Sequence, residues 1–269
     1  MSITCKRGAL IGALALTISS LTATSLAAAL ALPVLATTTI IKQHEFVRSA
    51  GQLPIPQSPA EKAESELSPQ AQFEADLAIF KEPLLGKVIL VDPGHGGNDP
   101  GAISGGVQEK SMTLNVSLLL REKLEALGAT VDMTRDNDKT LTLQERLDAS
   151  NRICPDVFIA VHGNSVTKPN IRGIETYYYD SRDQKLAELM LDNVSLKLKE
   201  PAKWSHARNL FVLDGNAVPA TLVEVGYLTN PTTRALLNTA TYQDQVASAL
   251  ADTLVTYLTD PKSARGCSA

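Results

Sequence analysis

Cysteine and aromatic residues are scarce in this chain of 269 residues, which has 3 cysteines and one tryptophan. So few cysteines exclude a disulfide-dense scaffold and a zinc site built from thiolates. Cys5 precedes an apolar run, whereas a lipoprotein acceptor follows one. Cys154 and Cys267 could pair in an oxidising compartment, but a plain buried thiol is the stronger interpretation of Cys154.

Clustered positive charge is also missing. The formal net charge is −4 and no basic block occurs, so nucleic acid is not expected as a partner. Hydrophobic residues make up 44% and charged residues 20%, an ordinary globular composition. The sequence therefore predicts a globular protein, which we expect to be a monomer.

The N-terminus is an export signal by its pattern. Lys6 and Arg7 precede a long run without charge, and Val34-Leu35-Ala36 offers small residues for cleavage. We therefore expect residues 1–36 to be a signal peptide, with a membrane anchor through residues 8–36 as the alternative because the run is long. Either reading places the remainder in the periplasm or cell wall.

Composition divides the rest of the chain. Residues 37–84 are rich in Pro, Gln, Ser, Ala and Glu, which predicts a flexible tether with one short helix near residues 73–80. Residues 85–260 carry regular patterns and form the expected catalytic domain. Residues 261–269 are a tail.

Strands alternate with helices in residues 85–260. Apolar or β-branched runs predict strands at 87–92, 129–135, 156–162, 173–179, 209–213 and 219–225. Helical spacing and capping pairs predict helices at 109–128, 142–153, 181–199, 230–238 and 242–258, with Thr142/Glu145 and Ser181/Gln184 as capping boxes and Asn230 before Pro231. The predicted fold class is α/β: a single domain with a central, mostly parallel twisted sheet and helices on both faces.

Four polar residues are predicted at one rim of that sheet. His95 follows the first strand, His162 ends the third, Glu224 lies near the end of the last, and Glu109 opens the first helix. Sites in such folds lie at the carboxyl ends of the strands, so these side chains are expected to meet.

Two imidazoles and one carboxylate are typical of an open catalytic zinc site. We assign His95, Glu109 and His162 as ligands of Zn²⁺ and Glu224 as the general base for a metal-activated water. Taken singly, each histidine could be structural and Glu109 could simply favour a helix start, but a lone Glu224 in an apolar strand would be costly.

Glycines surround His95 in "KVILVDPGHGGNDPGA", residues 87–102. Gly94, Gly96 and Gly97 let backbone and substrate approach closely, so Gly96 and Gly97 are assigned to substrate binding. A phosphate-binding loop is the alternative, but neither dinucleotide nor mononucleotide loop patterns are matched.

The motifs "VDPGHGGNDPGA", Glu109, "TRDND", "LQERLDASN", "DVFIAVHGNS", "GIETYYY" and "PATLVEVGYLTN" resemble the zinc-dependent N-acetylmuramoyl-L-alanine amidases of the Amidase_3 type. The resemblance covers about residues 86–258. It implies zinc bound by His95, Glu109 and His162, a catalytic Glu224, and peptidoglycan as substrate, cut between the lactyl group and L-alanine. Asn164 would then bond the substrate or the oxyanion.

Departures from the family pattern bear on regulation and activity. The family often has Ala where Gly163 stands, and the insert that blocks some members is absent, because only residues 165–172 separate "HGN" from "GIET". An external protein regulator is therefore expected. Two rival functions remain open: a zinc carboxypeptidase or peptidase on stem peptides, and a catalytically silent glycan-binding relative.

Overall fold

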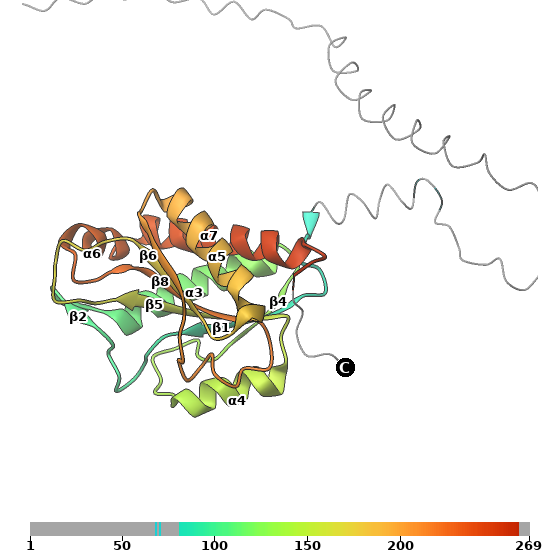
Figure 1. The fold of residues 1–269 in the computed structure, drawn as a ribbon, viewed down its shortest axis with the longest axis horizontal. Helices are drawn as coiled ribbons and strands as arrows, with labels where there is room; N and C mark the ends of the chain where they lie inside the picture. The colour runs from blue at the N-terminus through green and yellow to red at the C-terminus, as the bar shows by residue number, and fades with distance from the viewer. Residues whose placement is uncertain (1–67, 69, 71–80, 264–269) are drawn as a thin grey trace, which may run out of the picture. The chain divides into compact units, whose positions relative to one another are not determined.

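The computed structural model describes residues 68, 70 and 81–263. Its centre is a six-stranded sheet with helices on both faces, as Figure 1 shows. The strand order is β4-β1-β5-β8-β6-β7. The strands are β1 (Val88–Pro93), β4 (Thr130–Met133), β5 (Val157–Asn164), β6 (Ile174–Tyr178), β7 (Ala202–Ala207) and β8 (Ala220–Tyr227).

The sheet is mostly parallel. β1 pairs in parallel with β4 and β5, and β5 with β8, whereas β6 is antiparallel to β8 and parallel to β7. The carboxyl ends of β1, β5 and β8 therefore share one edge. The predicted fold class is confirmed.

Two apolar clusters hold the layers together. The larger one packs α3 (Glu109–Ala126), α5 (Ser181–Leu198) and α7 (Ala240–Thr259) on one face of the sheet. The smaller one lies on the other face, where Leu90, Phe158 and Leu222 pack beneath α4 (Leu143–Ile153) and the segment at 210–218. Figure 1 shows α4 alone on its side of the sheet. This face is less covered, so it can accommodate a site.

A short hairpin determines where Glu109 lies. A two-stranded hairpin that the sequence did not predict, β2 (Ile103–Ser104) with β3 (Val107–Gln108), leads directly into α3. Glu109 is thereby the first residue of that helix, where the helix dipole favours a carboxylate.

Two of the three predicted helix caps are confirmed. Thr142 and Glu145 form a reciprocal capping box, and Asn230 caps α6 (Pro231–Leu237) by accepting from the backbone of Thr233. The predicted box of Ser181 and Gln184 is wrong by one residue. Asp180 is the cap, because its carboxylate accepts a hydrogen bond from the backbone N–H of Arg182.

The strand predicted at 209–213 is wrong. This segment forms turns, and its apolar side chains Val212 and Leu213 are buried in the smaller cluster. The strand that occupies this part of the chain is β7, whose residues are partly or fully exposed because it is the edge of the sheet.

Several expectations fall outside the described residues: the signal peptide or anchor, most of the tether with its short helix at 73–80, and both Cys5 and Cys267. The prediction that Cys154 is a plain buried thiol is wrong, because this residue is half-buried and disulfide-bonded. Within the described part of the chain, no helix combines the length and apolar content that crossing a membrane requires.

Candidate metal centre

His95 lies directly after β1 on a backbone turn that two arginines support. Its φ of 60° is in the left-handed region, which costs a non-glycine residue about 1–3 kcal/mol. Arg135 Nη2 donates to the carbonyl of Gly94 at 2.8 Å, and Arg146 Nη2 donates to that of His95 at 2.6 Å. These bonds fix the backbone that directs the imidazole.

His162 reaches the same point from β5. The strand is irregular between His162 and Asn164, and the Gly163 N–H turns to donate to Glu109 Oε1 at 2.9 Å. A bulge of this kind re-aims a side chain at the end of a strand. The ring of His162 lies so close to Gly94 that a Cβ there would meet the ring at 2.4 Å. Gly94 is therefore required by the packing of a candidate ligand.

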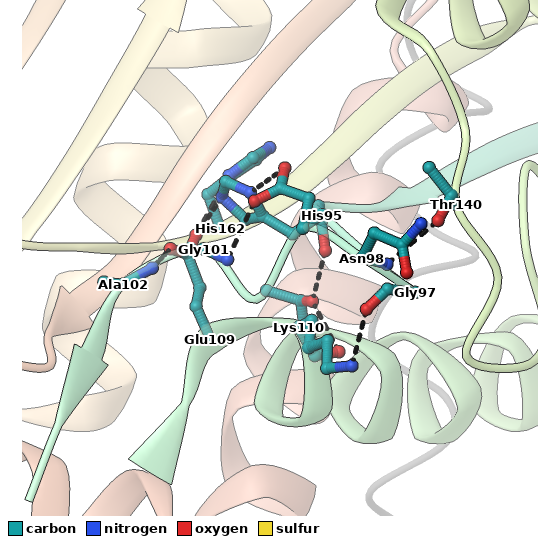
Figure 2. Close-up of polar contacts among 12 residues, drawn as sticks. His95, Gly97, Asn98, Gly101, Ala102, Glu109, Lys110, Thr140 and His162 are labelled. Atoms are coloured by element: carbon teal, nitrogen blue, oxygen red, sulfur yellow. Dashed lines mark hydrogen bonds and ion pairs between the residues drawn. The ribbon is translucent and has the colours of Figure 1, made fainter. Parts of the chain in front are cut away.

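The three predicted ligands meet at one carboxylate oxygen. His95 Nε2 and His162 Nδ1 each lie 3.0 Å from Glu109 Oε1. One donor atom from each residue lies within 4.8 Å of the other two, and Figure 2 shows the three side chains turned toward one another. The second oxygen, Oε2, accepts from the backbone of Ala102 at 2.9 Å. The carboxylate of Glu109 is thus held in place at both oxygens.

The surroundings of Glu109 and His95 favour the charged forms of both side chains. Burial raises the pKa of Glu109, but hydrogen bonds and charges of His162 and His95 outweigh it, so the net pKa is well below its usual range. Burial lowers the pKa of His95, yet Glu109 and Asp99 together raise it to about 9. The pocket is therefore built to hold positive charge beside Glu109.

Asp99 is a candidate site residue that sequence reasoning missed. Its Oδ2 lies 2.7 Å from His95 Nδ1, so the other ring nitrogen, Nε2, points at Glu109. Carboxylates bonded in this way orient metal-binding imidazoles and make them better ligands. The four-residue spacing between His95 and Asp99 was the available signal.

Glu224 lies beside this cluster on β8. It is the strand partner of His162, and its Oε2 is buried without a hydrogen-bond partner among the described residues. Burial, with the charges of Glu109 and Glu175, raises its pKa to about 8. An orphaned carboxylate oxygen of raised pKa is a group that could hold and release a proton near neutrality.

Glu175 on β6 is the second missed residue. It is buried and accepts hydrogen bonds from Tyr177 (2.7 Å), Asn164 (2.9 Å) and Tyr227. A carboxylate inside the aromatic run "GIETYYY" was the signal, since a buried charge needs such partners. Asn164 is therefore brought to the rim, with its amide already bonded to Glu175 and to the N–H of Ser165.

Gly96 and Gly97 lie against the loop at 139–140. A Cβ on Gly96 would meet the carbonyl of Lys139 at 2.4 Å, and one on Gly97 would meet the side chain of Thr140 at 2.2 Å. The Gly97 N–H donates to Asp138. The Asn98 N–H donates to Thr140, as Figure 2 shows. Packing of the two loops accounts for these glycines, and their assignment to substrate binding stays a prediction.

A cavity of about 330 Å³ opens onto the candidate ligands. The cavity lies on the face of the sheet that α4 covers. Its lining consists of Asp92, His95, Asp99, Leu141, Thr142, Leu143, Arg146, His162, Leu210, Phe211, Val212 and Leu222. Leu143 and Phe211 are about half exposed and give it an apolar margin. The loop at 165–173 between β5 and β6 contains no helix.

Comparison with known proteins finds a family model and a relative that are both described as amidases. Residues 89–256 match the family model Amidase_3, described as N-acetylmuramoyl-L-alanine amidase. The chain is 34% identical over 186 residues to the protein named "Probable cell wall amidase LytH" of Staphylococcus epidermidis, covering 68% of this chain. This chain spans 62% of the length of that relative.

Among the solved structures that share this fold are two amidases. The catalytic domain of CwlV, an N-acetylmuramoyl-L-alanine amidase from Bacillus (Paenibacillus) polymyxa var. colistinus, has a TM-score of 0.62 and 32% identity, covering 64% of this chain and 98% of that one. The CwlD amidase of Clostridioides difficile, solved in complex with the GerS lipoprotein, has a TM-score of 0.63 and 27% identity, covering 65% and 99%.

Proposed function

Since the chain belongs to the Amidase_3 family of N-acetylmuramoyl-L-alanine amidases, we propose that it is a zinc hydrolase of peptidoglycan. The bond cut is the amide between the lactyl group of N-acetylmuramic acid and the L-alanine of the stem peptide. The observation that supports this most is the convergence of His95 Nε2 and His162 Nδ1 on one oxygen of Glu109.

The donor set fits a catalytic zinc ion. His95, Glu109 and His162 offer two imidazole nitrogens and a carboxylate, the ligand types of open zinc sites. Asp99 holds the ring of His95, and the N–H groups of Ala102 and Gly163 hold Glu109, so the ligands need little reorganisation. When bound, zinc supplies Lewis acidity toward the amide carbonyl and lowers the pKa of water.

Glu224 acts as the general base. Its unpartnered Oε2 accepts the proton of the attacking water and delivers it to the nitrogen of the departing L-alanine. The raised pKa of about 8 suits both halves of this transfer, because the group binds and releases a proton near neutral pH. Water enters and product leaves through the cavity beside His162.

Substrate contacts are assigned to Asn164, Gly96 and Gly97. Asn164 Nδ2 donates one of its two hydrogens to Glu175, so the other hydrogen is available for the substrate or the developing oxyanion. Gly96 and Gly97 would present backbone to the substrate beside His95.

The protein is exported, by a signal peptide or anchor in residues 1–36, and acts as a monomer in the periplasm or cell wall. The relative LytH is named as a cell wall amidase, which agrees with this location. An external protein regulates it, by analogy with the CwlD amidase that was solved with the GerS lipoprotein. The loop between β5 and β6 supports external control, since it offers no helix to cover the cavity.

Mass spectrometry of digested muropeptides tests the function. The zinc-loaded protein should release an intact stem peptide with a free L-alanine amino group, and a chelator should stop the release. Shortened peptides would instead indicate a carboxypeptidase or peptidase. Binding without cleavage, while an authentic amidase cleaves in parallel, would indicate a silent glycan-binding relative.

Two variants test the roles. Glu224→Gln should retain one zinc per chain but lose turnover by at least about 100-fold, the lower range for a general base. His162→Ala should lose both zinc and turnover. Retained activity in Glu224→Gln would show that another group is the base.

A further inference from the structure

A row of four side chains crosses the less covered face of the sheet, starting at the metal centre. His162 on β5 pairs with Glu224 on β8, Glu224 pairs with Glu175 on β6, and Glu175 pairs with Trp204 on β7. Residues paired directly across neighbouring strands point to the same face. The row therefore connects a candidate metal ligand to the exposed edge of the sheet.

Aromatic rings line the edge end of this row. The ring of Trp204 lies 5.7 Å from that of His206, and His206 stacks on Tyr177 at 6.4 Å with 24° between the planes. Trp204 is 51% exposed although it is a large hydrophobic residue. Trp204 and His206 are exposed and lie next to the buried ring of Tyr177, on which His206 stacks. Exposed rings in such a group form a surface suited to contact with a ligand.

Arg208 adds a positive charge to this surface, and that charge also acts on Glu224. Its guanidinium lies 5.4 Å from the centre of the Tyr177 ring, and the residue is exposed. Within the described part of the chain, no carboxylate forms an ion pair with Arg208, whereas Arg146, Arg172 and Arg182 each have one. Arg121, Arg135, Arg152 and Arg234 also lack such a pair, so what distinguishes Arg208 is its position over the Tyr177 ring and its charge near Glu224. An arginine without an acidic partner next to a reaction site is available for an anionic group of a ligand.

We propose that Tyr177, Trp204, His206 and Arg208 form a subsite for the peptide arm of the substrate, in which Arg208 binds a carboxylate of that peptide. We call these four residues the peptide subsite. The proposal rests on the proposed function, since it names which part of the substrate lies on β6 and β7.

Charge selects the peptide arm over the glycan. In an N-acetylmuramoyl-L-alanine linkage the lactyl carboxyl group is consumed in the amide, so the glycan side carries no charge there. The free carboxylates of the substrate are on the stem peptide. A guanidinium matches a carboxylate with two parallel hydrogen bonds, and the aromatic rings would cover the apolar parts of the peptide.

Trp204 provides a direct probe, because it is the only tryptophan of the chain. The zinc-loaded Glu224→Gln protein should show a saturable change in tryptophan emission when titrated with a muropeptide that has free stem carboxylates. The same muropeptide with those carboxylates converted to amides should bind roughly 10- to 100-fold more weakly, the range for one charge-assisted hydrogen-bond pair. Equal affinity for both ligands, or no change in emission, overturns the proposal.

Substitution at the subsite tests the contact itself. Adding Arg208→Gln to the Glu224→Gln protein should abolish the preference for the free acid and leave the affinity for the amidated ligand unchanged. The matched control is Arg152→Gln, because Arg152 is an exposed arginine on α4; it should keep the full preference. An equal loss of affinity for both ligands in the Arg208 variant would show a structural role instead.

Turnover separates this proposal from the proposed function. The zinc-loaded wild-type protein should cleave the free-acid muropeptide with a kcat/KM roughly 10- to 100-fold higher than the amidated one. Equal kcat/KM values would overturn the peptide subsite but leave the amidase function standing. If neither is cleaved while an authentic amidase cleaves both, the function fails, and the fluorescence titration still decides the subsite.

Discussion

Glu224 and Glu175 are direct partners across the antiparallel pair of β8 and β6, yet their carboxylates are in opposite situations. Glu175 accepts hydrogen bonds from two tyrosines and an asparagine, whereas Glu224 Oε2 is buried without a partner. The donors around Glu175 hold its carboxylate in place. The charge of Glu175 disfavours ionisation of Glu224 and is one cause of the raised pKa of Glu224.

Glu175→Gln should lower the pKa of Glu224. Glu224 must be deprotonated to accept a proton, so the acid limb of the kcat/KM profile reports its ionisation in the free enzyme. Loss of the neighbouring negative charge favours the ionised form, so the limb should move to lower pH. A limb that stayed in place or moved to higher pH would contradict the electrostatic coupling.

The same variant should also be less stable. A glutamine places an amide N–H₂ where donors already point, which leaves a buried group unpaired at a cost of about 1–3 kcal/mol. Glu122→Gln is the matched control, because Glu122 is exposed on α3. It should change neither the pH profile nor the free energy of unfolding measured in urea.

Zinc should raise the melting temperature of the protein. A ligand at a hundred-fold excess over its Kd stabilises the native state by about 2.7 kcal/mol, and each kcal/mol shifts the melting temperature of a domain of this size by about 2–4 °C. Scanning calorimetry should therefore show a rise of roughly 5–10 °C that a chelator reverses. His162→Ala should remove the rise and His206→Ala should keep it, because His206 lies outside the cluster. A rise that persists in His162→Ala would place the zinc elsewhere.

Removing only one partner of the ion pair between Arg146 and Asp92 should lower the free energy of unfolding strongly. Arg146 Nη1 lies 2.5 Å from Asp92 Oδ1, and both side chains are buried. Arg146→Met removes the cation and leaves a buried carboxylate, so a loss of about 3–5 kcal/mol is expected in urea unfolding. Arg152→Met, an exposed change on the same helix, should stay within about 0.5 kcal/mol.

A double variant checks the cause of that loss. Adding Asp92→Leu to Arg146→Met removes the stranded charge, and most of the stability should return. If the double variant is no more stable than Arg146→Met alone, the loss comes from the hydrogen bonds of Arg146 to the carbonyls of Pro93 and His95.

Local patterns were sufficient for most of the fold. The capping box of Thr142 and Glu145 and the cap at Asn230 are local interactions, and the sequence predicted both. The apolar run at 209–213 was misleading because turns can bury Val212 and Leu213 as well as a strand can. β7 was missed because an edge strand has only part of its surface in the core, so its sequence lacks a regular apolar pattern.

The sequence was enough to predict the site residues that belong to rare, chemically distinctive types. It was not enough to predict a residue whose role depends on which side chains lie next to it in the fold. Two histidines and two glutamates at strand or helix ends were enough to predict His95, Glu109 and His162 as one group, which the structure brings together. Glu175 was missed because its partners come from three separate strands. Partners of that kind are fixed by strand register, which a single sequence does not reveal.

Gly94 and Gly163 both lie beside the candidate ligands, but alanine should have different effects at the two positions. At Gly94 a Cβ would meet three atoms of the His162 ring at 2.4–2.6 Å, so the ring must move. Gly94→Ala should therefore weaken zinc binding by at least about 10-fold in a competition with a metal indicator, comparable to the loss of a residue that orients a ligand.

At Gly163 the nearest atom is the terminal methyl of Met112 at 2.6 Å, which is the end of a flexible side chain. Gly163→Ala should therefore keep its zinc affinity within about 3-fold, since methionine adapts to small changes in volume. Both variants add the same methyl group, so a difference between them isolates the contact with His162. Equal zinc affinity in the two variants would show that the ring of His162 has room that this structure does not give it.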